Sequence, residues 1–311
     1  MTVKTISRRV LGGAKSETRK HPAVNSSEIS GQTFADPVHE FRGVIVVAVP
    51  HMDDEVLACG GTIARLPHKD RIHLIYATDG SRSPAPVLPA MDAAGPQLGF
   101  MRMQESRTAL EILGVPSRNL HFLGFPEARL RDFRKKFSEA FLELVKKIQP
   151  DHILAPFRYD RHPDHLVVNR ATTEALRSDA VSAQLSEYFV YHRWRLLSGG
   201  DIRKYVDSRH LVRIDIKNES AIKRQALNCF KSQTTKLYSW QDRPILSEKL
   251  LAEECDNPEL FLRYDPAIPG PKVFTNARGW IRFAHLVETP LKKKKEACRA
   301  LFYRITHSGK A

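Results

Sequence analysis

The sequence predicts an α/β fold: a three-layer, Rossmann-like, mostly parallel sheet with helices on both faces. Strand-like and helix-like patterns alternate from residue 43 to about residue 180, and this alternation is typical of a parallel sheet covered by helices. Residues 43–49 are apolar throughout, as expected of a strand buried on both faces. A chain of 311 residues with 42% hydrophobic residues can bury one full core with appendages.

The expected elements follow one another in chain order. Strands are predicted at residues 43–49, 72–76, 119–123 and 153–157, and helices at 102–113 and 133–148. A helix at 165–177, strands at 187–192 and 211–216, and a helix at 220–231 complete the prediction.

The connection at residues 81–99 is rich in Pro, Ala and Gly and is long for a link between a strand and a helix. Loops of this length in compact domains are usually functional or mobile. We interpret it as a wall or lid of a substrate cleft, with simple disorder as the alternative.

Two short motifs, about a hundred residues apart, contain the histidine and aspartate residues that are the best candidates for metal binding and catalysis. His51, Asp53 and Asp54 directly follow the first strand, and His162 and His165 follow a later one. Open α/β sheets bind ligands at the carboxyl ends of their strands, and a catalytic zinc needs three nitrogen or oxygen ligands with one position open for water. Adjacent acidic residues after a strand often only cap a helix, but their combination with these histidines favours a metal hydrolase.

The two motifs resemble those of the LmbE/PIG-L family of zinc-dependent N-acetylglucosaminyl de-N-acetylases: HMDDE at residues 51–55 and HPDH at residues 162–165. The resemblance extends in order over roughly residues 43–235. It includes the sequence ATDG at 77–80 and the predicted helix that contains Arg102.

The resemblance implies that His51, Asp54 and His165 bind Zn²⁺, or alternatively Fe²⁺ or another divalent ion. Asp53 would be the general base that takes a proton from the attacking water. The family usually has proline where this chain has Met52. Because that proline shapes the turn rather than binding metal, we expect an altered loop and an intact site.

Four more positions receive roles from the same resemblance. His162 would be protonated, would stabilise the oxyanion and could donate a proton to the departing amine. Asp164 would orient His162 and favour its charged form. Arg102 and Asp79 would contact substrate hydroxyls or a neighbouring anionic group.

The implied function is a metal-dependent hydrolase that removes an N-acetyl group from an N-acetylated amino sugar, a GlcNAc-type conjugate that is lipid-linked or part of a glycan. The alternative is a catalytically inactive basic module of the same fold that binds an anionic membrane surface or a glycan. A nucleotide-binding domain is disfavoured, because no G-x-G-x-x-G follows the first strand and Asp53 and Asp54 would repel a pyrophosphate. Nucleic acid is not expected as a partner, since the basic residues are scattered and lack interleaved aromatics.

Three segments are expected: a flexible polar arm at 1–38, the deacetylase-like domain at 39–288, and a basic amphipathic tail at 289–311. The formal charge of the chain is +14, and the tail contains consecutive lysines at 292–295 beside apolar residues on one helical face. Such a helix can lie on an anionic membrane surface, and four lysines suit a solvated helix face equally well.

The sequence shows neither a signal-peptide core nor a run of about 18 apolar residues. We therefore expect a cytoplasmic protein, or one held at the inner face of the membrane by its tail. The four cysteines have no zinc-finger or disulfide spacing. Cys59 lies near the site, but we expect a small buried hydrophobe rather than a metal ligand. The oligomeric state stays open.

Overall fold

The computed structural model describes residues 34–84, 95–178, 181–192 and 201–265. The predicted tail at 289–311, residues 1–33 of the predicted arm and the centre of the 81–99 loop lie outside the described residues. At the described end of that arm, the Ala35 N–H donates to the carbonyl of Arg213 (2.8 Å). Within the described ranges, no helix is long and apolar enough to cross a membrane.

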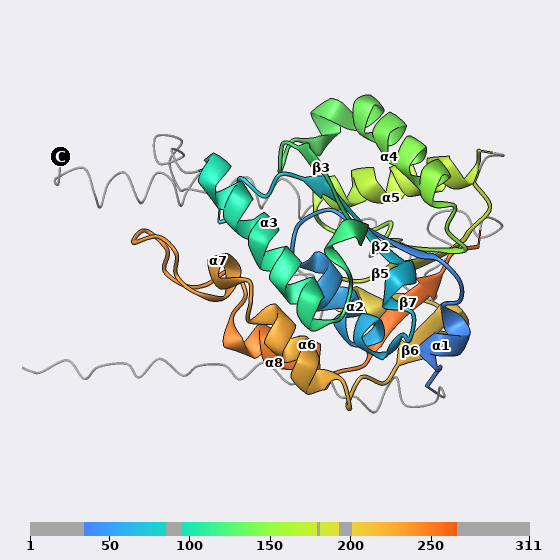
Figure 1. Ribbon diagram of the computed structural model, residues 1–311. Coiled ribbons are helices and arrows are strands. Elements are labelled where there is room, and N and C mark those ends of the chain that lie inside the picture. The colour runs from blue at the N-terminus through green and yellow to red at the C-terminus, as the bar shows by residue number, and fades with distance from the viewer. Residues whose placement is uncertain (1–33, 85–94, 179–180, 193–200, 266–311) are drawn as a thin grey trace, which may run out of the picture. The chain divides into compact units, whose positions relative to one another are not determined.

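The described residues form a seven-stranded sheet with the strand order β3-β2-β1-β4-β5-β7-β6 (Figure 1). The first five strands run parallel, whereas β7 pairs antiparallel with both β5 and β6. The predicted α/β fold with a mostly parallel sheet is therefore confirmed. The strand bounds are β1 (Ile45–Val49), β2 (Ile72–Thr78), β3 (Leu120–Phe125), β4 (His152–Pro156), β5 (Gln184–Tyr188), β6 (Leu211–Ile214) and β7 (Glu259–Arg263).

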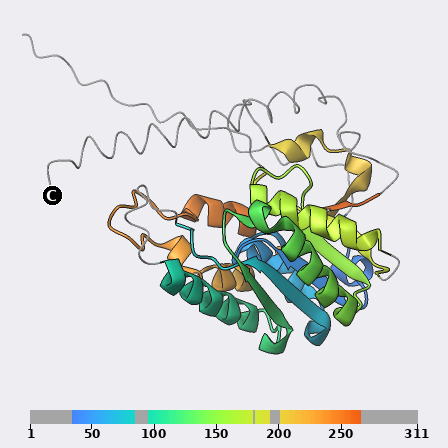
Figure 2. The same cartoon turned by 90° about the horizontal axis from the view of Figure 1, so that it is seen from above.

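Helices cover both faces of the sheet, as predicted. Their bounds are α1 (Pro37–Glu40), α2 (Asp54–Arg65), α3 (Gly95–Ile112), α4 (Arg134–Ile148), α5 (Pro163–Leu176), α6 (Ser220–Leu227), α7 (Lys231–Thr234) and α8 (Glu248–Asp256). Side chains of α4 and α5 share a core with Val46 and Ala48 of β1. Those of α2, α3, α6 and α8 share the other core with Val47 and Val49. Figure 2 shows α4 and α5 on one side of the sheet and α3 on the other.

β1 is apolar at every position because successive strand residues point to opposite faces of a sheet. Both faces of this sheet are covered by helices, so all five residues of β1 are buried. The uniform apolar run from which the strand was predicted is the direct consequence of this layering.

Some elements differ from their predicted bounds. β5 lies at Gln184–Tyr188 rather than at 187–192, because its pairing with β4 sets the register from Gln184 onward. The helix predicted at 220–231 is broken into α6 and α7, since Phe230 is fully buried and leaves the helical conformation between them. The strand β7 and the helix α8 were not predicted.

The two motifs meet at the topological switch point of the sheet, between β1 and β4. From β1 the chain adds β2 and then β3 on one side, whereas β4 lies on the other side of β1 and leads to β5. The carboxyl ends of β1 and β4 therefore border the kind of crevice in which open α/β sheets bind ligands. His51 follows β1 and His162 follows β4, which explains how two distant motifs come together.

Candidate metal centre

Three side chains predicted to bind metal converge on one point. His51 Nδ1 lies 3.3 Å from Asp54 Oδ2, and His165 Nε2 lies 3.1 Å from both of these atoms. Donors around a tetrahedral zinc, with bonds of about 2.0–2.1 Å, lie roughly 3.3 Å from one another. The three side chains are buried, with 5%, 2% and 0% of their surface exposed. The donor set and its spacing therefore fit a divalent metal ion.

The second nitrogen of each of these two imidazoles faces a carboxylate. His51 Nε2 lies 3.2 Å from Asp164 Oδ2, and His165 Nδ1 lies 3.2 Å from Asp160 Oδ2. Histidines that bind metals commonly direct their other nitrogen at a carboxylate, which fixes the ring orientation and raises its basicity. Asp160 was not predicted, although it stands only two residues before His162.

The carboxylates make this position favourable for positive charge. Burial lowers the pKa of His165, but Asp160 and Asp54 outweigh it and raise the pKa to about 9. Burial likewise opposes ionisation of Asp54, yet His165 and His51 hold the pKa of its carboxyl well below the usual range. An arrangement that stabilises a proton on two buried imidazoles also suits a bound cation.

Asp53, the predicted base, lies beside this cluster in an unusual backbone conformation. It precedes the first residue of α2 and has φ 135°, a region that non-glycine residues rarely adopt. The Glu55 carboxylate accepts the Asp53 N–H (2.9 Å), so Glu55 caps the helix start. Burial raises the pKa of Asp53 well above its usual value, and the charge of Arg102 opposes this shift. Such strain persists only where the surroundings hold it in place.

His162 is the most exposed of the three motif histidines. Its side chain is 22% exposed, and its ring meets that of His51 edge-on with the centroids 4.4 Å apart. One nitrogen from each of His51, His162 and His165 lies within 4.8 Å of the others. His162 Nδ1 accepts the N–H of Asp164 (3.3 Å), which places the ring proton on Nε2.

Asp164 lies differently from the prediction. Its Oδ2 is 4.0 Å from His162 Nδ1 but only 3.2 Å from His51 Nε2. It also accepts the backbone N–H groups of Ala128 (2.7 Å) and Leu130 (3.1 Å). These bonds fix the carboxylate against His51, because two loop amides hold it from the other side.

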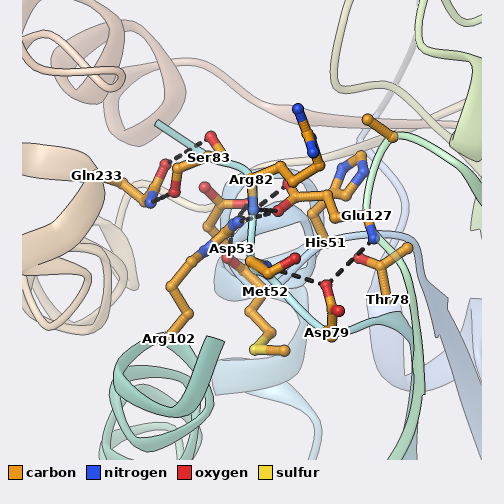
Figure 3. A network of polar contacts seen from close by, with 12 residues as sticks. His51, Met52, Asp53, Thr78, Asp79, Arg82, Ser83, Arg102, Glu127 and Gln233 are labelled. Atoms are coloured by element: carbon orange, nitrogen blue, oxygen red, sulfur yellow. Dashed lines mark hydrogen bonds and ion pairs between the residues drawn. The ribbon is translucent and has the colours of Figure 1, made fainter. Parts of the chain in front are cut away.

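Arg102 was predicted to contact substrate, but its guanidinium is engaged within the protein (Figure 3). It is 1% exposed. Nη1 donates to Glu127 Oε1 (3.1 Å), and Nη2 donates to the carbonyl of Met52 (2.7 Å) and lies 3.5 Å from Asp53 Oδ1. Arg102 thus supports the strained turn that carries Asp53.

Asp79, the other predicted substrate contact, also binds backbone. Its Oδ1 accepts the N–H of Ser81 (3.0 Å) and that of Glu127 (3.1 Å). Glu127 Oε2 in turn accepts the N–H of Arg82 (2.7 Å). Asp79 and Glu127 together connect the loops after β2 and β3, as Figure 3 shows.

Met52 and Cys59 are both buried. Met52 replaces the family's proline, and its side chain is buried at 2% exposure, while the donor atoms around it still converge. Cys59 is fully buried, and burial raises the pKa of its thiol well above the usual value. A buried thiol of this kind packs as a small hydrophobic side chain.

Sequence reasoning missed Glu127, Asp160 and Tyr191. The ring of Tyr191 lies 5.2 Å from that of His165 and 5.9 Å from that of His162, measured between centroids. Asp160 could have been found from its place beside the second motif. Glu127 and Tyr191 belong to other segments, and only the fold brings them to the site.

The chain is similar in sequence to several known proteins. The family model for PIG-L, described as GlcNAc-PI de-N-acetylase, matches residues 46–176. The uncharacterized deacetylase YaiS of Escherichia coli is 30% identical over 142 residues, which are 44% of this chain and 69% of that protein. The diacetylchitobiose deacetylase of Thermococcus kodakarensis is 29% identical over 135 residues, or 42% of this chain. The match spans about half of that relative, 47% of its length.

A solved structure shows a similar fold. The N,N'-diacetylchitobiose deacetylase from Pyrococcus horikoshii superimposes with a TM-score of 0.53 and 19% identity, over 75% of this chain and 87% of that one. At this level of identity the likeness concerns the fold.

Proposed function

The chain belongs to the PIG-L family, and on that premise we propose that it is a metal-dependent hydrolase that removes the acetyl group from an N-acetylated amino sugar. One observation carries the proposal: His51, Asp54 and His165 converge at a spacing suited to a divalent ion, with Asp53 directly beside them. A buried metal site with an adjacent carboxylate can hydrolyse an unreactive amide, because the metal activates water and the carboxylate accepts its proton.

His51, Asp54 and His165 are the proposed ligands, and Zn²⁺ is the proposed ion, although the same donors suit Fe²⁺. When bound, the ion supplies Lewis-acid chemistry by activating water and polarising the amide carbonyl. Asp164 and Asp160 hold the two imidazoles in orientation through their second nitrogens.

Asp53 is the proposed general base. Its carboxylate accepts the proton of the attacking water, and its neighbour Asp54 faces the metal position. Two adjacent carboxylates beside one cation can divide these roles because their side chains point to different partners. Burial raises the pKa of Asp53, and the charge of Arg102, 3.5 Å from Asp53 Oδ1, opposes this shift and so favours the ionised form that a base requires.

His162 is the proposed oxyanion donor. Its Nδ1 accepts a backbone N–H, so Nε2 carries the proton that the developing oxyanion attracts. As the tetrahedral intermediate collapses, the proton that Asp53 accepted from the water passes to the departing amine, while the Nε2–H of the neutral His162 ring remains a hydrogen-bond donor to the oxygen.

The proposed substrate is a GlcNAc-type conjugate. The matching family model is described as a GlcNAc-PI de-N-acetylase, and one relative is named a diacetylchitobiose deacetylase. Both names refer to an N-acetylglucosamine unit linked to another group, which supports this sugar as the common element of the substrate.

The test is amine release from N-acetylglucosamine conjugates by wild-type protein and Asp53→Asn, both loaded with zinc. We expect the variant to lose about 10²–10⁴-fold in turnover while it keeps its metal, because Asp53 is not a ligand. Asp132→Asn, an exposed carboxylate, serves as the matched control. Full turnover in Asp53→Asn would remove Asp53 as base, and metal-loaded wild-type protein that cleaves no acetamido sugar would refute the function.

A further inference from the structure

Tyr191 presents an aromatic ring to solvent directly beside the metal centre. It follows β5, and its ring stacks against His162 and lies next to His165. Nevertheless, 45% of the residue is exposed. A partly exposed aromatic side chain beside a buried polar cluster can pack against a bound ligand.

The backbone of Tyr191 is held on both sides. Its N–H donates to Asp160 Oδ2 (3.2 Å), the same oxygen that faces His165 Nδ1. The next residue, His192, is 5% exposed, and its carbonyl accepts the N–H of Ile202 (2.9 Å). The ring therefore projects from a fixed segment whose position is tied to the ligand His165.

Exposure indicates the side from which a substrate reaches the site. The proposed ligands are 5% exposed or less, and the Asp53 side chain is 9% exposed. The His162 side chain is 22% exposed and Tyr191 45%. Among the described residues of the cluster, these two thus form its open side.

We infer that Tyr191 is a substrate-contacting residue whose ring packs against the pyranose ring of the amino sugar. This inference rests on the proposed function. The apolar C–H face of a pyranose complements the electron-rich face of an aromatic ring. The contact holds the sugar while its acetamido group lies between Asp53 and His162. Tyr191 thereby selects for a ring-bearing substrate over a simple amide.

The test compares Tyr191→Phe and Tyr191→Ala with wild-type protein on two zinc-loaded reactions. One substrate is an N-acetylglucosamine glycoside, and the other is N-acetylethanolamine, which has the amide without the ring. We expect Tyr191→Ala to raise KM for the sugar about three- to tenfold and to leave the acyclic amide unchanged. Tyr191→Phe retains the ring and should match wild type. Phe34→Ala removes another exposed ring (52%), beside Arg213, and should change nothing.

Binding and metal content provide readouts that do not depend on turnover. In an Asp53→Asn background, calorimetry should show a three- to tenfold weaker affinity for N-acetylglucosamine when Tyr191→Ala is added, with metal content unchanged. Equal losses on both substrates together with lost metal would mean that the ring only shields the imidazoles, and would overturn the inference. Unchanged sugar affinity and KM would overturn it as well. Metal-loaded wild-type protein inactive on all amides would refute the proposed function first, and this role of Tyr191 with it.

Discussion

At the scale of residues, two buried aspartates share the task of orienting the proposed metal ligands. Asp164 faces His51 and Asp160 faces His165, each at 3.2 Å. Both are at most 2% exposed, so their charge is little screened by solvent. Their effect on the metal is therefore expected to be strong although neither is a proposed ligand.

Asp160→Asn keeps the size of the side chain and removes its charge. Because His165 then loses its anionic partner, we expect zinc affinity to fall about 10–100-fold. Competition with a chelator of known affinity measures this change. Asp132→Asn, where the carboxylate is 56% exposed, should keep wild-type affinity. Equal affinities of all three proteins would exclude Asp160 as a support of the ligand.

Arg102→Met tests the support of the strained turn at Asp53. The substitution leaves Glu127 buried without its cationic partner and frees the carbonyl of Met52. Removal of one partner of a buried ion pair costs about 3–5 kcal/mol, which urea unfolding measures. Arg129→Met breaks a pair in which both side chains are more than half exposed, so we expect less than about 1 kcal/mol. Similar small losses in both variants would contradict a clamping role.

The site residues that could be predicted from the sequence are those that belong to a short, continuous motif. His51, Asp53, Asp54, His162 and His165 stand in two short motifs, and the structure brings them together. The partners of Arg102 and Asp164 depend on which loops the fold places beside them. For that reason Arg102 meets Glu127 and Met52, and Asp164 meets His51.

At the scale of elements, α2 carries the site at its start and is anchored further along by the unpredicted strand β7. Glu259 of β7 accepts the N–H groups of Gly61 (2.7 Å) and Thr62 (2.8 Å). Lys223 of α6 donates to the same carboxylate (2.8 Å) and is fully buried. A side chain at Gly61 would meet Ile216 at 2.5 Å, so glycine permits this close approach.

Lys223→Met tests this anchor. The variant leaves Glu259 buried without its countercharge, and we expect a loss of about 3 kcal/mol in the free energy of unfolding. Arg224→Met is the matched control on the same helix, because its partner Glu248 is 79% exposed, and it should cost less than about 1 kcal/mol. Equal losses of unfolding free energy in the two variants would mean that the buried Lys223–Glu259 pair stabilises the fold no more than an exposed pair.

At the scale of the whole molecule, the sequence predicted the parallel strands and β6, but not β7, the strand through which β6 joins the sheet in antiparallel pairing. Strands β1 to β4 are apolar runs between helical segments, and such patterns are local. β7 begins with Glu259 and ends with Arg263, charges that pair with Lys223 and Glu40. Because those partners lie on distant segments, no local pattern distinguishes this strand from a loop.

His152 links the stability of the fold to pH. It opens β4, at the opposite end of the strand from the metal centre, and burial lowers its pKa to about 4, opposed by Glu40 and reinforced by Arg263. In the unfolded chain its pKa is near 6.5, so the unfolded state binds the proton first as pH falls. The free energy of unfolding therefore does not depend on His152 above about pH 6.5. Between about pH 6.5 and pH 4 it decreases, by about 3 kcal/mol at most.

Urea unfolding of wild-type protein and His152→Gln between pH 4 and pH 7.5 measures this effect. Carboxylates titrate in both proteins, so the difference between the two curves isolates the histidine. We expect wild-type stability to fall relative to the variant as pH decreases below about 6.5. Parallel curves would show that His152 titrates alike in the folded and unfolded states.

The position of the metal is the most direct test of the proposed ligand set. Crystals of zinc-loaded protein, measured by anomalous diffraction at the zinc absorption edge, would locate the ion and its ligands. We predict one ion bound by His51 Nδ1, Asp54 Oδ2 and His165 Nε2 at about 2.0–2.2 Å, with Asp160 and Asp164 behind the imidazoles and Asp53 unbound. An ion held by His51, His162 and His165 with Asp54 outside its reach, or no ion at this position, would contradict it.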